Sequence, residues 1–246
     1  MEGTKTCSNL AKYPNNLVFG GGGLLEDTPV ICGGQDLNTE CYMHDKGNTT
    51  WQLLGNLVTG RRLFGAAIFK GALWVTGGNN ANLSGLPLDS TEIIALDGTV
   101  TSGTNLPKPR HGHCMVVTNN DEFMILGSSS SGLQRSTMTY NANSETFTNG
   151  PSMIHDRRFA TCSMFQSKLH NDRQVVLCAG GFNDNGTAEL LDFSQENAFA
   201  SLVSMQHLAF FSIIGANYRR EKMTVWQELS ELFELFELFS LEIFFS

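Results

Sequence analysis

The sequence predicts an all-β fold built from repeated four-stranded units, and three observations support this prediction. Short apolar runs end in a pair of small residues four times, at Gly33, Gly77, Gly127 and Gly180. The intervals of roughly 44, 50 and 53 residues fall in the range of repeat proteins. The chain also holds 25 glycines among 246 residues, as expected of a protein rich in turns.

Each repeat contains four candidate strands. In the second repeat, GAAIF (65–69) and ALWVT (72–76) predict a hairpin closed at Lys70-Gly71. A third strand at 92–94 and a short fourth strand near 98–100 follow. The glycine pair is expected where a strand leaves a crowded centre and turns, because glycine reaches positive φ at little cost.

Other residues keep step with the glycines. Arg62, Arg110 and Arg158 each precede a strand pair, and Trp51 and Phe147 each lie about 11 residues before one of these arginines. A double glycine after an apolar strand, followed by an aromatic residue and an arginine-led hairpin, resembles the kelch repeat over residues 29–193. The Gly127-Ser128 pair departs from the kelch pattern.

The kelch resemblance implies a β-propeller, in which four-stranded blades surround an axis. About three to four blades are expected here, whereas kelch propellers resemble closed rings of about six blades. The chain is therefore expected to be an incomplete propeller with a non-propeller tail. Residues 1–28 are assigned to a partial blade or irregular segment, 29–199 to the kelch repeats and 200–246 to the tail.

The C-terminal tail leaves three alternatives open. It begins with an apolar run at 198–216 and ends in a Glu-Leu-Phe repeat. The run approaches the length of a membrane span, but Gln206 and His207 lie at its middle. A membrane span is therefore disfavoured. An amphipathic helix and a gene-model artefact are the other two explanations.

The net charge of −8 argues against a nucleic-acid partner, because phosphate binding needs clustered basic residues. No catalytic or cofactor motif stands out in the sequence. His111 and His113 lie two apart, but a third metal ligand is not evident, and packing beside the repeat arginine is expected instead. We therefore expect no metal, no cofactor and no enzymatic activity.

The cysteines suggest two disulfides. Cys162 and Cys178 are expected to face each other across a hairpin, and Cys32 and Cys41 flank a turn in the same way. Buried free cysteines are the alternative for each pair. Cys7 and Cys114 lack evident partners. The six cysteines include no C-x-x-C pair, so no zinc site is expected.

Three N-x-S/T sequons, at Asn48, Asn82 and Asn185, are candidate glycosylation sites in loops. Together with the predicted disulfides they favour an extracellular protein. The N-terminal residues show no signal peptide, which favours the cytoplasmic alternative unless the true N-terminus is absent.

The repeat arginines are candidates for partner binding. By resemblance to kelch domains, they could line one face of the ring and contact acidic partners, and the alternative is that they tie neighbouring blades through backbone carbonyls. The candidates are Arg61, Arg62, Arg110, Arg157 and Arg158.

The function expected from the sequence is a non-catalytic kelch propeller that binds a protein, or a glycan carried on one. Two alternatives stay open. One is an enzyme on the same fold, such as a copper oxidase similar to galactose oxidase or a sugar-acid isomerase. The other is an intracellular adaptor that presents substrates to a ligase.

Overall fold

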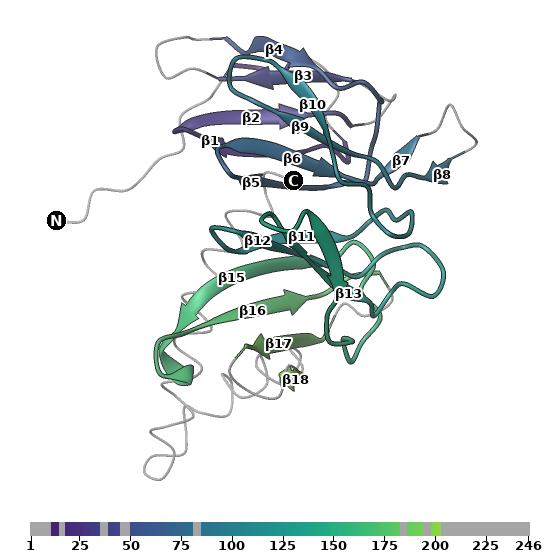
Figure 1. Cartoon of the computed structure of the whole chain (residues 1–246), viewed down its shortest axis with the longest axis vertical. Coiled ribbons are helices and arrows are strands. Elements are labelled where there is room, and N and C mark those ends of the chain that lie inside the picture. Colours follow the sequence, from purple (N-terminus) through teal and green to yellow (C-terminus); the bar gives the residue numbers. More distant parts are fainter. Residues whose placement is uncertain are drawn as a thin grey trace, which may run out of the picture.

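The computed structural model describes residues 11–14, 18–34, 39–44, 50–80, 85–182, 186–193 and 198–202. These residues form four antiparallel sheets of four strands each, which follow one another in chain order (Figure 1). In the described part of the chain, the helical content is a single 3₁₀ turn, η3 (Lys168–His170). The all-β prediction and the four-stranded unit are confirmed.

The sheets take consecutive stretches of the chain. The first sheet contains β1 (Gly21–Leu25), β2 (Thr28–Cys32), β3 (Glu40–Met43) and β4 (Gln52–Asn56). The second contains β5 (Gly65–Phe69), β6 (Ala72–Thr76), β9 (Thr91–Ile94) and β10 (Val100–Gly103). The third contains β11 (Cys114–Asn119), β12 (Glu122–Leu126), β13 (Thr137–Asn141) and β14 (Thr146–Asn149). The fourth contains β15 (Thr161–Ser167), β16 (Arg173–Ala179), β17 (Ala188–Asp192) and β18 (Phe199–Leu202). A small ribbon of β7 (Asn79–Asn80) and β8 (Leu86–Pro87) extends from the second sheet.

Two-residue turns close the first hairpin of the first three sheets, whereas a five-residue connection that contains η3 closes that of the fourth. In the second sheet, Lys70 and Gly71 have φ values of 52° and 73°, so both central residues are left-handed, as a type I′ turn requires. The strands on either side pair from Gly65–Thr76 to Phe69–Ala72. The hairpin predicted at Lys70-Gly71 is therefore confirmed.

The first strand of each sheet is its innermost strand. β1 contacts β5, β5 contacts β11 and β11 contacts β15, so these strands lie side by side in chain order. A cavity of about 470 Å³ lies where they converge. Its walls come from all four strands: Gly22, Ala66, Met115, Val116, Val117, Cys162, Ser163 and Met164.

Three apolar cores join the sheets face to face. β12 shows how they are built, because its residues alternate between two faces. Phe123 and Ile125 pack toward the second sheet, whereas Met124 and Leu126 pack toward the fourth. Both faces of the strand are buried, which explains why such strands read as continuous apolar runs.

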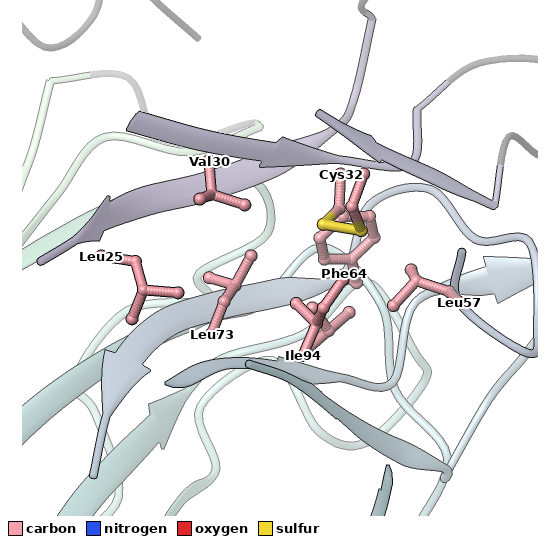
Figure 2. Close-up of a cluster of buried hydrophobic side chains, with 9 residues drawn as sticks. Leu25, Val30, Cys32, Leu57, Phe64, Leu73 and Ile94 are labelled. Atoms are coloured by element: carbon pink, nitrogen blue, oxygen red, sulfur yellow. A yellow bond between two sulfur atoms is a disulfide. The ribbon is translucent and has the colours of Figure 1, made fainter. Parts of the chain in front are cut away.

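The first core fills the space between the first and second sheets. In Figure 2, Val30 and Cys32 of β2 point toward Leu73 and Ile94 of the second sheet. Phe64, just ahead of β5, closes the core beside the disulfide.

Two strands, β1 and β18, reach beyond residues 29–199, the stretch assigned to the repeats from the sequence. β1 pairs with β2 and completes the first sheet, so the segment assigned to residues 1–28 contributes a full inner strand. At the other end, β18 extends past residue 199 to Leu202. Residues 203–246, which hold most of the predicted tail, lie outside the described residues. Within the described ranges, no helix has the length and apolar character needed to span a bilayer.

Candidate functional site

The glycine stops bring neighbouring sheets together. Gly33, Gly77 and Gly127 have φ values of 64°, 58° and 70°. A Cβ atom on Gly33 would lie 2.6 Å from the carbonyl oxygen of Arg61, and one on Gly77 would lie 2.5 Å from that of Arg110. Glycine is needed here both for its left-handed conformation and for the close approach of the next sheet.

The residue after each of these glycines ties the sheets by a hydrogen bond. The N–H of Gly34 donates to the carbonyl of Arg61 over 3.1 Å, and that of Gly78 donates to Arg110 over 2.9 Å. The N–H of Ser128 donates in the same way to Arg157 over 2.9 Å. Ser128 stands where the other two sheets have a second glycine, and its backbone makes the same hydrogen bond.

The arginine side chains turn inward to their own sheets. Arg61, Arg110 and Arg157 are at most 1% exposed. Arg61 Nη1 donates to the carbonyls of Gly77 and Ser90 over 2.8 and 2.9 Å. These three arginines are therefore unavailable to an external partner. The candidate role in partner binding is corrected for them. Their side chains bind backbone carbonyls of their own sheet, and the tie to the neighbouring sheet, which was the alternative, is made by their own carbonyl oxygens.

Two of the buried arginines, Arg61 and Arg157, each pair with a buried glutamate of their own sheet. Glu92 lies against Arg61, and it also accepts hydrogen bonds from the backbone N–H groups of Val58 and Thr59 over 2.6 and 3.1 Å. Burial lowers the pKa of Arg61, and the charge of Glu92 opposes that shift. The carboxylate thus compensates for the desolvation of the guanidinium.

The fourth sheet repeats this arrangement. Glu189 accepts from Arg157 Nε and from the backbone N–H of Ile154, both over 2.7 Å. Neither Glu92 nor Glu189 is among the residues singled out from the sequence. A signal exists, because each is the second residue of its sheet's third strand, in TEII and AELLD.

The third sheet lacks the carboxylate. Met138 holds the register position of Glu92 and Glu189, opposite the residue two before the first glycine of the stop. Arg110 Nη1 donates to the carbonyl of Gly127 over 3.3 Å. Its Nε and Nη2 are buried without a hydrogen-bond partner among the described residues. Burial lowers the pKa of Arg110 to about 10.

A second change accompanies the first. Pro107 lies three residues before Arg110, where Val58 and Ile154 precede the other two arginines. Proline has no backbone N–H, so this loop lacks the donor that the glutamate accepts from in the second and fourth sheets. The third sheet therefore lacks both the carboxylate, at Met138, and the backbone N–H donor, at Pro107.

A short segment leads from each buried arginine into the first strand of its sheet. Leu63, Gly112 and Phe159 occupy equivalent positions and have φ values between 56° and 62°. Leu63 N–H donates to Phe19 over 2.9 Å, Gly112 to Leu63 over 2.7 Å and Phe159 to Gly112 over 2.9 Å. This chain of hydrogen bonds passes from sheet to sheet. We call the surface around it the axial mouth, comprising Phe19, Arg62, His111, Arg158, Phe159 and Phe182.

The axial mouth combines cations with exposed aromatic rings. Phe19, Phe159 and Phe182 are 52%, 47% and 59% exposed. The guanidinium of Arg158 lies over the ring of Phe182, 5.2 Å from its centroid. Arg62 and Arg158 are half-buried, unlike the fully buried arginines beside them, and the Nε of each is buried without a hydrogen-bond partner among the described residues.

His111 adds a neutral ring to the mouth. Burial lowers its pKa, and the nearby charge of Arg62 lowers it further. Both effects favour the uncharged form of the imidazole, which lies near the cation of Arg62. Guanidinium groups recognise carboxylates, and aromatic faces stack on apolar sugar faces and hold cations.

His113, two residues on, faces the interior. Its Nε2 accepts from the backbone N–H of Gly65 over 3.2 Å and lies 3.0 Å from Thr76 Oγ1. Burial and the charge of Arg110 lower its pKa to about 3. His113 thus packs beside the repeat arginine, as expected. In the part of the chain that the structure describes, no group of three His, Cys, Asp or Glu residues could hold a metal ion.

The two cysteine pairs differ. Cys32 and Cys41 lie opposite each other in register and form the predicted disulfide. Cys162 and Cys178 also lie directly opposite, so their predicted register is confirmed, but both are free thiols. Cys162 lies against the thiol of Cys114 instead, with the two sulfurs 2.7 Å apart. The expected second bridge is therefore not formed in this structure.

The three sequons cannot be placed on the fold. Asn48, Asn82 and Asn185 all lie outside the described residues, and their glycosylation stays a prediction.

Comparisons with known proteins give a likeness of fold. No family model matches the chain, and no curated protein matches it. Among solved structures, that of YjhT is similar with a TM-score of 0.64 at 15% sequence identity. The match covers 79% of this chain and 68% of YjhT. The two chains therefore share a fold over most of the described sheets.

Proposed function

We propose that this chain is a kelch-type β-propeller module that binds a protein, or a glycan carried on one, and performs no chemistry of its own. Four sheets with innermost strands in chain order support the propeller. The glycine stop that repeats beside each buried arginine supports the kelch type. The fold shared with YjhT is compatible with both statements.

The axial mouth is the proposed binding surface. One observation carries this proposal: the residue that follows each buried arginine is Arg62, His111 and Arg158 in turn, and a chain of hydrogen bonds holds these segments side by side. Exposed rings of Phe159 and Phe182 lie at the same end. This combination suits a ligand that bears carboxylates, such as an acidic segment of a protein or an acidic sugar.

Binding to arrays of acidic and neutral glycans and of acidic peptides tests the proposal. The full chain should retain carboxylate-bearing ligands, and their Kd should rise at least about tenfold when Arg62 and Arg158 are both changed to Ala. Lys70→Ala is the matched control, because Lys70 is a half-exposed cation at the opposite end of β5. Failure to retain any acidic ligand, or an equal loss in Lys70→Ala, would contradict the proposal.

The enzyme alternative predicts a different result. An oxidase similar to galactose oxidase would carry copper, and metal analysis of the purified full chain distinguishes it from a binding module. A sugar-acid isomerase would convert its ligand, which incubation of the retained glycan followed by mass spectrometry detects.

We also propose that the protein works outside the cell. The disulfide between Cys32 and Cys41 supports an oxidising compartment. The intracellular adaptor alternative requires both cysteines to be reduced in the cell. Non-reducing mass spectrometry of protein trapped with an alkylating agent at the moment of lysis separates the two.

A further inference from the structure

Three thiols meet where the third and fourth sheets pack together. Cys114 begins β11, the innermost strand of the third sheet, whereas Cys162 and Cys178 lie in β15 and β16 of the fourth. β11 and β15 are in contact. All three cysteines are free.

Cys162 is the central member of this cluster. Its sulfur lies 2.7 Å from that of Cys114, across the boundary between the sheets. Within its own sheet it lies directly opposite Cys178 in the register of the hairpin. One sulfur therefore has two partners within reach, and it can bond to only one of them at a time.

The three thiols differ in their access to solvent. Cys178 is fully buried, whereas Cys114 and Cys162 are half-buried. Cys162 also lines the axial cavity of about 470 Å³. Burial raises the pKa of Cys162 and of Cys178; the neighbouring thiols raise that of Cys162 further, whereas the hydrogen bond with Cys162 opposes the shift at Cys178. A soluble oxidant thus reaches Cys114 or Cys162 before it reaches Cys178.

The first sheet shows what a cysteine pair does without a third thiol. Cys32 and Cys41 stand in the same register relation as Cys162 and Cys178, and they are bonded. The fourth-sheet pair stands in the same relation but is unbonded, and Cys114 is the evident difference between the two environments.

We propose that Cys114, Cys162 and Cys178 form a thiol–disulfide exchange site, in which oxidation joins Cys114 to Cys162 and Cys178 is the exchange partner. The oxidant is a small-molecule disulfide, RSSR. The thiolate of Cys114 or Cys162 attacks one sulfur of RSSR, forms a mixed disulfide and releases one RSH. The neighbouring thiolate then attacks the protein sulfur of that mixed disulfide and releases the second RSH. Two protein thiols are oxidised and one RSSR is reduced.

Exchange with Cys178 needs no further oxidant. The Cys178 thiolate attacks the sulfur of Cys162, a new bond forms between these two sulfurs, and the bond to Cys114 breaks. The sulfur of Cys114 leaves as a thiolate and takes up a proton. The two oxidised forms differ in what they join: the bond from Cys162 to Cys114 links two sheets, whereas the bond to Cys178 lies within one hairpin.

The inter-sheet bond has the larger consequence for the fold. It closes a loop of 48 residues, about three times the loop between Cys162 and Cys178. Restriction of the unfolded chain grows with loop length, so the bond between Cys114 and Cys162 should raise the Tm more than the bond within the hairpin does.

Peptide mapping under non-reducing conditions tests the proposal on the full chain. The chain carries Cys7→Ser to remove an unrelated thiol, is mildly reduced, and is then incubated with oxidised glutathione. Remaining thiols are blocked with N-ethylmaleimide before digestion. The expected product links the peptides of Cys114 and Cys162. Cys114→Ser should move the bond to Cys162 and Cys178, and Cys178→Ser should keep it at Cys114 and Cys162.

Two further measurements keep the test decisive. Cys162→Ser should leave Cys114 and Cys178 unlinked, because the central sulfur is lost, and the Cys32–Cys41 bond serves as the internal control for oxidation. If Cys162→Ser does not fold, the Cys114→Ser and Cys178→Ser variants still separate the two bonds. The proposal is overturned if Cys114 stays free or holds glutathione while Cys32 and Cys41 are fully oxidised. It is overturned equally if Cys162 bonds only to Cys178 in the chain that retains Cys114.

Discussion

The second and fourth sheets bury an arginine with a glutamate, whereas the third sheet buries the same arginine without one. Arg61 and Arg157 contact Glu92 and Glu189, whereas in the sheet of Arg110 the equivalent register position is held by Met138. The backbone contact of the arginine carbonyl with the preceding sheet is nonetheless the same in all three cases. The backbone role of the repeat arginine is therefore separable from its ion pair.

The difference teaches which part of the repeat can vary. An unpaired charge is costly to bury, yet Arg110 keeps one hydrogen bond to Gly127 and holds its place. Its uncompensated charge also contributes to the low pKa of His113. We therefore expect the three sheets to respond unequally to the same substitutions.

The largest effect should follow loss of one carboxylate. Glu92→Gln leaves the buried Arg61 without a counter-charge and should lower the free energy of unfolding by about 3 kcal/mol or more. Urea unfolding of the full chain, followed by circular dichroism, measures it. Met138→Leu, a volume-conserving change at the equivalent position, should cost less than about 1.5 kcal/mol. Equal losses in the two variants would show that the ion pair contributes little.

The glycine stops allow the backbone contact to be tested alone. Gly127 and Gly180 have similar φ values, 70° and 65°, so an alanine at either position is strained by about 1–2 kcal/mol. A Cβ on Gly127 would also collide with the carbonyl of Arg157, whereas one on Gly180 meets nothing within 4 Å. Gly127→Ala should therefore destabilise the protein by about 1–3 kcal/mol more than Gly180→Ala. Thermal unfolding of both variants checks the difference, and identical midpoints would mean that neighbouring sheets separate freely.

Acid should destabilise the third sheet through His113. The folded pKa of about 3 lies below the ordinary value of 6.5, so the unfolded chain binds more protons between these pH values. The contribution of neutral His113 to the free energy of unfolding is therefore fully present above about pH 6.5 and is lost as the pH drops toward 3. At pH 5.5 the loss from this group should be about 1 kcal/mol.

Unfolding free energies measured from pH 7 to pH 5 in the wild type and in His113→Gln isolate this contribution. The pKa of His111 is lowered as well, so the variant should keep part of the pH dependence. Parallel profiles for the two proteins would mean that folding does not lower the pKa of His113.

The smallest effect is expected at Arg110. Because Arg110 has no carboxylate partner among the described residues, Arg110→Met leaves no buried charge behind and removes one hydrogen bond. The change in unfolding free energy should stay within about 1 kcal/mol. The same urea titrations measure it. A loss as large as that of Glu92→Gln would reveal a carboxylate or other anion that compensates for Arg110 in solution.

The sequence by itself determined the repeating unit. Periodic glycines, two-residue turns such as Lys70-Gly71 and alternating apolar residues are local signals, because strand pairing within a hairpin depends on residues close together in the chain. For the same reason, the opposite positions of Cys32 and Cys41 and of Cys162 and Cys178 could be predicted from spacing along the hairpins.

Only the tertiary structure decided what lies between the sheets. Spacing in the sequence did not distinguish the two arginines of each pair. Packing buried Arg61 and Arg157 and left Arg62 and Arg158 at the axial mouth. Packing also brought Cys114 to Cys162 across a sheet boundary. Contacts between sheets join residues some 50 positions apart, and their partners are set by how two twisted faces fit together. No pattern along a single strand carries that information.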